Sequence, residues 1–267
     1  MTEKLRLDIA LHLRGLAPSR EKARGMIMAG EVLVNGSRVD KPGTRVTGSD
    51  DIIVKAKPRF VSRGGEKLAG ALLDFSFDVT GRICADVGAS TGGFTDCLLQ
   101  HGAARVYAID VGYGQIDLRL RNDSRVIVME RTNARHIERL PEPVDLVVID
   151  ASFISLKILL PVIKGWLATQ ADIIALVKPQ FEAGKGEVGK GGVVRSAEVH
   201  SRVLDDVTAF ARRAGFSLRG LTISPLKGPA GNIEFLMWLA TDATSGDFDV
   251  SGWLQAHLTG PASPPDI

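Results

Sequence analysis

Two patterns of hydrophobic positions divide the chain, and the first is typical of a small α+β unit. Apolar residues recur at helical spacing between positions 5 and 16, and Pro18 ends this run. Ser19 predicts the N-cap of a second helix, which Gly30 ends. The pair Asn35-Gly36 predicts a β-hairpin turn, because both residues tolerate positive φ. The expected strands of this unit are residues 31–34, 37–39 and 51–54.

The second pattern consists of near-continuous apolar runs separated by segments that suit helices or loops. Such runs are typical of strands buried on both faces of a mostly parallel, doubly wound α/β sheet. We expect these strands at residues 82–87, 106–110, 126–129, 144–150 and 173–178, with a late strand at 232–240. The domain boundaries that we expect are a first domain at 1–57, a linker at 58–64, a second domain at 65–242 and a peripheral tail at 243–267.

Charge is distributed unevenly along the chain, although the net charge is only +2. Residues 1–64 contain 13 lysines and arginines against 7 acidic residues, whereas residues 65–267 contain 20 against 24. A basic first domain on a mildly acidic second one favours a polyanionic partner, and a merely solvated basic face is the alternative. The two cysteines, Cys84 and Cys97, lack metal-ligand spacing, which favours a reducing compartment.

No segment has the composition of a membrane span or a signal peptide. The charged N-terminus lacks an apolar stretch. The most apolar later stretch, residues 159–177, is interrupted by Lys164, Gln170 and Asp172, so it falls short of the ~18 apolar residues that a span needs. We therefore expect a cytoplasmic protein with no membrane contact.

A glycine-rich loop follows the first expected strand and opens a helix. Glycines there let the backbone approach a ligand, and free N–H groups at a helix start favour an anionic group. Asp110 ends the next strand, where an acid can accept hydrogen bonds from ribose hydroxyls. A dinucleotide-binding loop would carry glycine where Ser90 stands, so a NAD site is disfavoured. The loop instead resembles the first motif of Rossmann-like methyltransferases, which implies S-adenosylmethionine as cofactor. Its expected contact residues are Asp86, Gly88, Ala89, Ser90, Thr91, Gly92, Gly93, Phe94 and Asp110.

Two other motifs offer competing interpretations. Residues 88–92 match the Gly-x-Ser-x-Gly turn of hydrolases, which would make Ser90 a nucleophile with His200 or His257 as its base. Residues 184–191 are one hydroxyl short of a phosphate-binding P-loop, because Gly191 stands where serine or threonine would bind magnesium. We interpret this second segment as a glycine-rich loop that closes over a substrate.

Four ionisable residues fall where a doubly wound sheet would gather them. Asp150 and Lys178 end two expected strands, and Glu234 lies at the start of the last one. Lys67 precedes the first strand of the sheet. Two lysines and two carboxylates form a nearly neutral set, which lowers the cost of bringing four charges together. The alternative is two ordinary surface ion pairs.

These four residues, together with residues 86–94, 147–156, 176–182 and 231–235, resemble the TlyA family within the FtsJ-like ribose 2′-O-methyltransferases. Residues 6–11, 19–20 and 30–36 resemble the RNA-binding domain of ribosomal protein S-four. The resemblance implies a Rossmann-like class I methyltransferase that methylates cytidine 2′-oxygens of 16S rRNA, 23S rRNA or both. It also implies that Lys67, Asp150, Lys178 and Glu234 are catalytic and that no metal is required. The family has also been called hemolysin, but nothing in this sequence is built to enter a membrane.

We expect Lys178 to contact the 2′-oxygen and to steer or accept its proton, while Asp150 and Glu234 hold the geometry. Phosphate contacts are expected from Arg6, Arg20, Lys22, Arg24 and Arg63. Thr132 and Asn133 follow the third strand of the sheet and are expected beside the adenine ring. Two functions remain open as alternatives: an RNA-binding module with an inactive methyltransferase fold, and the Ser90-based hydrolase.

Overall fold

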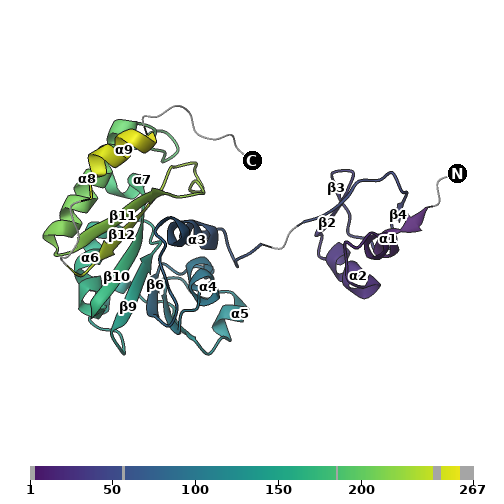
Figure 1. Cartoon of the computed structure of the whole chain (residues 1–267), viewed down its shortest axis with the longest axis horizontal. Helices are drawn as coiled ribbons and strands as arrows, with labels where there is room; N and C mark the ends of the chain where they lie inside the picture. Colours follow the sequence, from purple (N-terminus) through teal and green to yellow (C-terminus); the bar gives the residue numbers. More distant parts are fainter. Residues whose placement is uncertain (1–3, 56–57, 185, 243–247, 259–267) are drawn as a thin grey trace. The chain divides into compact units, whose positions relative to one another are not determined.

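The computed structural model describes residues 4–55, 58–184, 186–242 and 248–258. The chain divides into two compact units, Met1–Pro58 and Arg59–Ile267, and each is described by itself (Figure 1). This division lies next to Pro58, in the segment where the sequence predicts a linker.

The first unit packs two helices against short strands. Ser19 caps the second helix by accepting a hydrogen bond from the Lys22 N–H at 3.1 Å, as predicted. Asn35 and Gly36 have φ values of 51° and 76°, which form the predicted hairpin turn. Leu7, which begins the first helix, is fully buried in this unit's own apolar core. The elements are β1 (Leu5–Arg6), α1 (Leu7–Leu13), α2 (Arg20–Met28), β2 (Val32–Val34), β3 (Ser37–Arg38), β4 (Arg45–Val46) and β5 (Ile52–Val54).

The second unit is a mostly parallel, seven-stranded sheet with helices on both faces, the doubly wound arrangement that the apolar runs predict (Figure 1). The strand order is β11-β12-β10-β9-β6-β7-β8, and only β12 runs antiparallel to its neighbours. The strands are β6 (Ile83–Val87), β7 (Arg105–Ile109), β8 (Val126–Met129), β9 (Val144–Ile149), β10 (Leu167–Val177), β11 (Ser217–Ile223) and β12 (Phe235–Ala240). The edge strand β11 is not among the predicted strands.

Two apolar cores lie on the two faces of this sheet, one of them shared with α6, α8 and α9 and the other with α3, α4 and α5. The helices are α3 (Gly64–Asp74), α4 (Gly93–Gln100), α5 (Leu118–Arg121), η1 (Ala134–His136), α6 (Leu156–Ile163), η2 (Lys164–Trp166), α7 (Pro179–Glu182), α8 (Ala197–Arg213) and α9 (Val250–Leu258). Helix α9 lies inside the segment predicted to be a tail, yet its Val250 and Leu254 are buried in the larger core. The remainder of that tail, 243–247 and 259–267, lies outside the described residues.

The segment predicted as a linker is packed against the second unit. Phe60 is buried in the core formed with α3 and α4. The Val61 N–H donates to the Asp96 carboxylate at 2.8 Å, and the Gln100 side chain donates to the Arg59 carbonyl at 3.0 Å. Residues 59–64 are therefore part of the second unit's fold, and Gly64 already begins α3.

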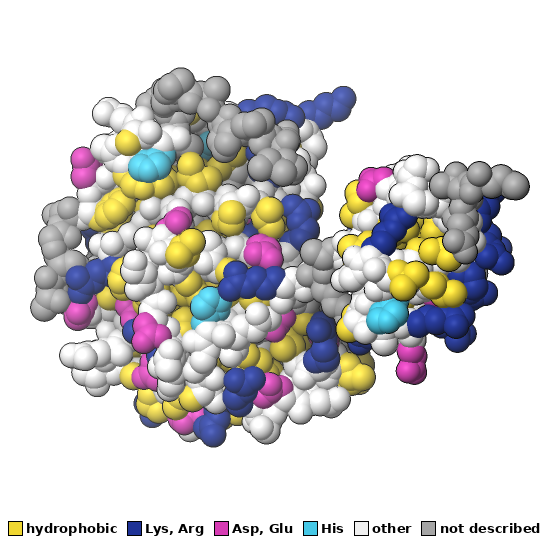
Figure 2. Space-filling model, turned by 45° about the vertical axis from the view of Figure 1, so that its right-hand side comes forward, with side chains coloured by type: hydrophobic (Ala, Val, Ile, Leu, Met, Phe, Trp, Pro, Cys, Tyr) yellow, Lys and Arg dark blue, Asp and Glu magenta, His cyan; other side chains and the backbone are white. Residues whose placement is uncertain are grey.

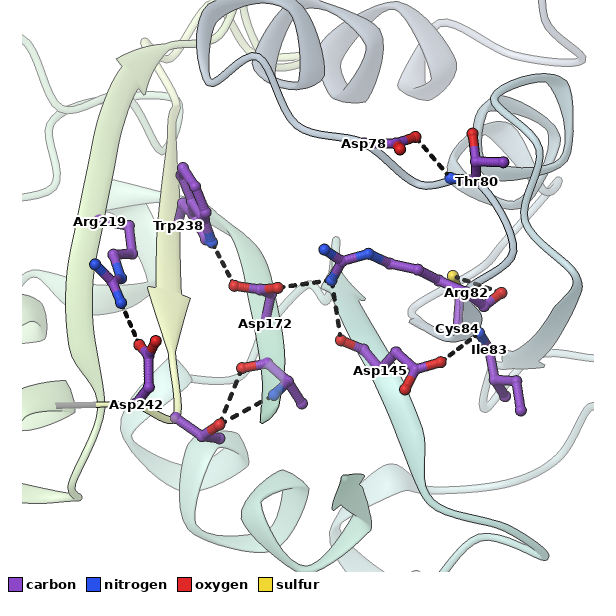
Figure 3. Close-up of polar contacts among 12 residues, drawn as sticks. Asp78, Thr80, Arg82, Ile83, Cys84, Asp145, Asp172, Arg219, Trp238 and Asp242 are labelled. Carbon is purple, nitrogen blue, oxygen red and sulfur yellow. Dashed lines mark hydrogen bonds and ion pairs between the residues drawn. The ribbon is translucent and has the colours of Figure 1, made fainter. Parts of the chain in front are cut away.

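A closed polar network spans the amino edge of the sheet (Figure 3). Arg82 pairs with Asp172 at 2.6 Å, and Asp172 also accepts from the Trp238 indole at 2.8 Å. Asp145 accepts from the Ile83 N–H at 2.9 Å. These contacts tie β6, β9, β10 and β12 together at this edge of the sheet.

Candidate active site

Five predicted site residues emerge from the carboxyl edge of the parallel strands. Strand register pairs Val87 with both Ile109 and Ile149, so β6, β7 and β9 end at one level. Val177 at the end of β10 pairs with Phe235 at the start of the antiparallel β12. The residues that follow or precede these ends, Gly88, Asp110, Asp150, Lys178 and Glu234, therefore gather at one edge.

The four ionisable residues form two close ion pairs. The Lys178 ammonium lies 2.6 Å from the Asp150 carboxylate, and the Lys67 ammonium lies 2.5 Å from the Glu234 carboxylate. Both lysines are buried, and Glu234 is only 1% exposed. Buried charges are tolerated only when they are paired, so each partner fixes the position of the other.

Lys178 is held by more than one acceptor. Its ammonium also donates to the Ser152 hydroxyl at 2.9 Å and to the Asp150 carbonyl at 3.4 Å. An ammonium has three N–H donors and no acceptor, so Asp150 and Ser152 together define its direction. Ser152 was missed by the sequence analysis, although it lies in the Asp-Ala-Ser-Phe segment directly after β9.

The two ion pairs meet at one cavity of about 340 Å³, which Lys67 and Asp150 both line. Gly64 brings them together: a Cβ there would lie 3.8 Å from the Asp150 carboxylate. Lys178 and Glu234 are the ion-pair partners of Asp150 and Lys67, so their charged groups lie directly beside the residues that line this cavity. The other lining residues are Ser62, Arg63, Gly64, Gly88, Ala89, Ser90, Thr91, Gly93, Phe94, Lys227 and Pro229.

The turn after β6 requires glycine at position 88, and it holds Ser90 in a left-handed backbone conformation. Gly88 has φ +87°, and a Cβ there would lie 2.8 Å from the Asp150 carbonyl oxygen. Ser90 has φ +49°, and its N–H donates to Asp110 at 2.8 Å. The other Asp110 oxygen accepts from the Gly112 N–H at 2.7 Å. Asp110 thus braces the turn and keeps lone pairs for a ligand.

A second cavity of about 290 Å³ lies on the other side of this turn. It shares Gly88, Ser90 and Asp150 with the first cavity. It combines the Asp110 carboxylate with an apolar lining, which fits a nucleoside: hydroxyls for the carboxylate and a flat ring for the apolar wall. The remaining lining residues are Val87, Ile109, Val111, Gln115, Thr132, Asn133, Ala134, Ala151, Ser152, Phe153, Ile154 and Leu159.

Thr132 and Asn133 line this second cavity, and their side chains already have local partners. The Thr132 hydroxyl donates to the Glu130 carbonyl at 2.9 Å. The Asn133 side-chain oxygen accepts from the Arg135 N–H at 3.1 Å and caps η1. Their side chains therefore also set the path of the backbone along the cavity wall.

Two residues expected to contact the cofactor line neither cavity. Asp86 is fully buried, and one of its oxygens accepts from the Thr95 hydroxyl at 2.7 Å. Burial raises its pKa to about 7. Gly92 has φ +96° and packs so closely on Leu120 that a Cβ would lie 2.2 Å from that side chain. Both residues support the loop in this ligand-free structure, and their predicted contact with the cofactor stays a prediction.

Comparison with known proteins shows to which protein family this chain belongs. A sequence profile of the FtsJ-like methyltransferase family matches residues 60–241, and that of the S4 domain matches residues 5–52. The 16S/23S rRNA (cytidine-2′-O)-methyltransferase TlyA of Mycobacterium tuberculosis is 49% identical, over 90% of this chain and 91% of its own. The chain belongs to the TlyA family of FtsJ-like methyltransferases.

Other TlyA-family relatives agree over most of both chains. The 23S rRNA (cytidine-2′-O)-methyltransferase TlyA of Campylobacter jejuni is 32% identical, over 88% of this chain and 98% of its own. A solved structure of a hemolysin-named protein from Streptococcus thermophilus is 43% identical, covers 96% of this chain and 94% of its own, and superposes with a TM-score of 0.72. Within the described ranges, no helix is long and apolar enough to cross a membrane.

The hydrolase alternative finds no support in the contacts of Ser90. Its hydroxyl donates to the Gln115 side-chain oxygen at 3.4 Å, which is an amide and not a base. His200 is buried beside Phe235, with a ring-centroid distance of 5.6 Å. His257 stacks on Trp253 at 4.4 Å. Within the described residues neither histidine contacts Ser90, so its contacts do not support a nucleophilic serine.

The segment 184–191 has no phosphate-loop architecture in the residues that are described. Gly189 and Val193 form an isolated bridge, and Gly191 and Gly192 between them have positive φ, so the segment ends in a tight hairpin. Lys185 lies outside the described residues. The described ranges also contain no group of three or more histidine, cysteine, aspartate or glutamate side chains able to hold a metal ion.

The five predicted RNA-contact residues are distributed over both units. Arg6 and Arg20 both pair with the buried carboxylate of Asp8 at 3.0 Å, so one acid fixes two guanidinium groups. Lys22 and Arg24 are exposed on α2. Arg63 belongs to the second unit and lines the first cavity. Figure 2 shows basic side chains gathered on the smaller unit, the S4 domain.

Two further residues were missed by the sequence analysis. Phe153 is 90% exposed, has φ +62° and lines the second cavity. Its ring lies 5.0 Å from that of Phe181. Lys227 lines the first cavity from the β11–β12 turn. The exposure of this phenylalanine could not be predicted from the sequence, because the hydrophobic pattern assigns an apolar residue to the core.

Proposed function

We propose that the chain catalyses S-adenosylmethionine-dependent methylation of the 2′-oxygen of cytidine in ribosomal RNA. The observation that carries the proposal is the meeting of the Lys178–Asp150 and Lys67–Glu234 pairs at one cavity. This cavity shares the glycine turn with a second cavity, which combines the Asp110 carboxylate with an apolar lining. The cytidine 2′-oxygen comes from the names of the Mycobacterium tuberculosis and Campylobacter jejuni relatives.

The second cavity is the proposed site of the cofactor's adenosine. Asp110 would accept hydrogen bonds from the ribose hydroxyls, and the wall that includes Val111 and Ala134 would cover the adenine. The turn at Gly88 and Ser90, which lines both cavities, would carry the amino-acid end towards Lys67 and Asp150. S-adenosylmethionine supplies an activated sulfonium methyl group when it is bound.

The protein's part in the reaction is mainly alignment of the RNA hydroxyl, which can contribute about 7–11 kcal/mol. In our proposal Lys178 contacts the 2′-oxygen and directs its proton, while Asp150 and Ser152 hold the ammonium in place. Lys67, fixed by Glu234, lines the same cavity and keeps the site electrically balanced. Removing either carboxylate would leave a buried, unpaired lysine.

Phe153 is the proposed stacking surface for the base of the target nucleotide. It is a nearly fully exposed aromatic ring next to the Asp150–Ser152 segment, backed by Phe181. Sequence-specific RNA enzymes stack unpaired bases on such rings. Phe153→Ala is expected to lower kcat/KM for RNA and to leave S-adenosylmethionine affinity unchanged, whereas Phe153→Trp should preserve both. Because Phe153 also lines the second cavity, equal activity of the alanine variant and wild type, or a loss of cofactor affinity, would exclude this role.

RNA capture is assigned to the S4 domain, with Arg6, Arg20, Lys22 and Arg24 contacting phosphates, and to Arg63 at the cavity. The relatives' names differ in substrate, one naming both 16S and 23S RNA and the other only 23S RNA. Both ribosomal subunits are therefore the substrates to test.

The test compares wild type with Lys178→Ala for transfer of labelled methyl to ribosomal RNA. Lys178→Ala is expected to abolish transfer while calorimetry shows unchanged S-adenosylmethionine binding, because the lysine acts on the RNA hydroxyl. Lys157→Ala on α6, outside both cavities, is the matched control and should remain active. Turnover retained by Lys178→Ala would rule out its role. RNA binding without transfer by wild type would favour the inactive-module alternative, and esterase activity lost in Ser90→Ala would favour the hydrolase.

A further inference from the structure

Residues 224–230 of the β11–β12 turn form part of the first cavity's wall but belong to none of the predicted site motifs. The turn places Lys227 and Pro229 on the cavity that Lys67 and Asp150 also line. Lys227 is exposed, and it has no ion-pair or hydrogen-bond partner within the part of the chain that the structure describes. An unpaired cation at a cavity whose other charges are paired is available for an anion.

The charges that line this cavity favour a polyanionic ligand. Asp150 is neutralised by Lys178, and Lys67 is neutralised by Glu234. Arg63 and Lys227 remain as cations without a described acidic partner. The ribose in the proposed reaction is flanked by phosphates on both sides, so two free cations at the cavity match the charge of the bound chain.

Asn232 holds the turn that carries Lys227. It is 2% exposed, and its main-chain oxygen accepts from the Gly228 N–H at 2.9 Å. Its side chain accepts from the Val194 N–H at 2.9 Å and donates to the Gly192 carbonyl at 2.9 Å. All three bonds involve groups in loops, so one buried amide fixes the Lys227 turn against the hairpin that contains Gly192.

The turn is also fixed on its other side. The Ser224 hydroxyl donates to the Leu226 carbonyl at 2.7 Å. Pro225 packs on α3, where a Cβ at Gly70 would lie 2.9 Å from the proline ring. The same helix carries Lys67, so the backbone next to Lys227 is packed against the helix that carries Lys67. A rigid support lowers the entropy lost when a side chain binds.

We propose that Lys227 is a substrate-binding residue that contacts an RNA phosphate next to the target ribose, and that Asn232 is its positioning residue. This inference rests on the proposed function, since it assumes that RNA enters the first cavity. A contact with the cofactor's carboxylate is the competing possibility for the same ammonium.

The test measures RNA KM, kcat and the salt dependence of RNA binding for Lys227→Ala and Lys227→Arg. Lys227→Ala is expected to raise KM about tenfold with kcat unchanged, and Lys227→Arg to restore KM. The slope of log affinity against log salt should become shallower by about 0.7–0.9, the value of one phosphate contact. S-adenosylmethionine affinity should not change. Unchanged KM, or a loss of cofactor affinity that matches the rise in KM, overturns the proposal.

Arg213→Ala is the matched control, because it removes one exposed cation next to the start of β11, at the opposite edge of the sheet. It should leave KM unaltered. Asn232→Ala should raise KM in the wild-type background but add nothing to the KM of Lys227→Ala. An equal rise in both backgrounds would reject the positioning role. If Asn232→Ala fails to fold, the Lys227 variants alone decide the proposal.

The outcomes separate this inference from the proposed function. Methyl transfer by wild type together with an unaltered Lys227→Ala variant refutes only the role of Lys227. No transfer by wild type refutes the proposed function, and filter-retention measurements of RNA binding with the same variants then still decide whether Lys227 contacts RNA.

Discussion

Asp86 combines complete burial with a carboxyl oxygen that has no hydrogen-bond partner among the described residues. Its other oxygen accepts from Thr95 in α4, and desolvation raises its pKa from 3.8 to about 7. The carboxyl therefore holds a proton in the folded state at pH values where the unfolded chain has lost it. The residue links the end of β6 to α4, so its titration affects the element that carries the ligand loop.

The sign of the resulting pH dependence follows from the raised pKa of Asp86. Its contribution to folding is complete below 3.8 and is lost as pH rises through about 7. Asp86→Asn cannot titrate, so its melting temperature should fall less between pH 5 and pH 8 than that of wild type. Thermal unfolding at the two pH values measures this. Identical changes in the two proteins would show that Asp86 is already ionised at pH 5.

At the scale of secondary structure, the sequence predicted those caps, turns and strands that short-range interactions determine. Ser19 as a cap, Asn35-Gly36 as a hairpin turn and the buried parallel strands all follow from short-range preferences. Strand β11 was missed because Arg219 and Gly220 interrupt its apolar pattern, and only its pairing with β12 makes it a strand. Helix α9 was missed because a Gly-, Ser- and Asp-rich sequence surrounds its few apolar residues.

The candidate site divides in the same way. Strand ends are visible in the sequence, so the positions of Asp150, Lys178 and Glu234 at one edge could be predicted from it. Ser152 and Lys227 lie in loops, and their distances to the other residues depend on tertiary packing, which periodicity does not encode. The burial of Asp86 could likewise not be predicted from the sequence, since a position in a motif does not show which way the side chain points.

Helix α9 provides a prediction at the scale of the element. Leu254 is 4% exposed in the core that includes α8. Leu254→Ala should lower the free energy of unfolding by about 2–5 kcal/mol, because it removes packed apolar volume. Ser251→Ala, an exposed position on the same helix, is the control. Denaturant unfolding measures both variants, and equal stability of the two would show that α9 is peripheral.

At the scale of the whole molecule, our proposal assigns four of the RNA-contact residues to the S4 domain and the chemistry to the second unit. The S4 domain contributes exposed Lys22 and Arg24 on α2, whereas the cofactor cavities lie entirely in the second unit. This separation means that RNA affinity and cofactor affinity should change independently on mutation. The net charge of the chain is near zero and does not show this difference between the units. The distribution of charge along the sequence does show it.

Replacing Lys22 and Arg24 together by alanine should raise the RNA KM and make the salt dependence of binding shallower by about 1.4–1.8. S-adenosylmethionine affinity should remain that of wild type. The control removes Arg139 and Arg213, two exposed cations that line neither cavity. Equal effects of the two double variants would indicate a non-specific loss of charge instead of phosphate contacts by α2.

The most direct measurement of the central claim maps the methylated atom. Both purified ribosomal subunits are incubated with the protein and labelled S-adenosylmethionine, and the RNA is digested and analysed by mass spectrometry. The account predicts 2′-O-methylcytidine with wild type and none with Lys178→Ala. Label on a base, on a ribosomal protein or on no component would contradict the assignment of the Lys67, Asp150, Lys178 and Glu234 site to ribose methylation.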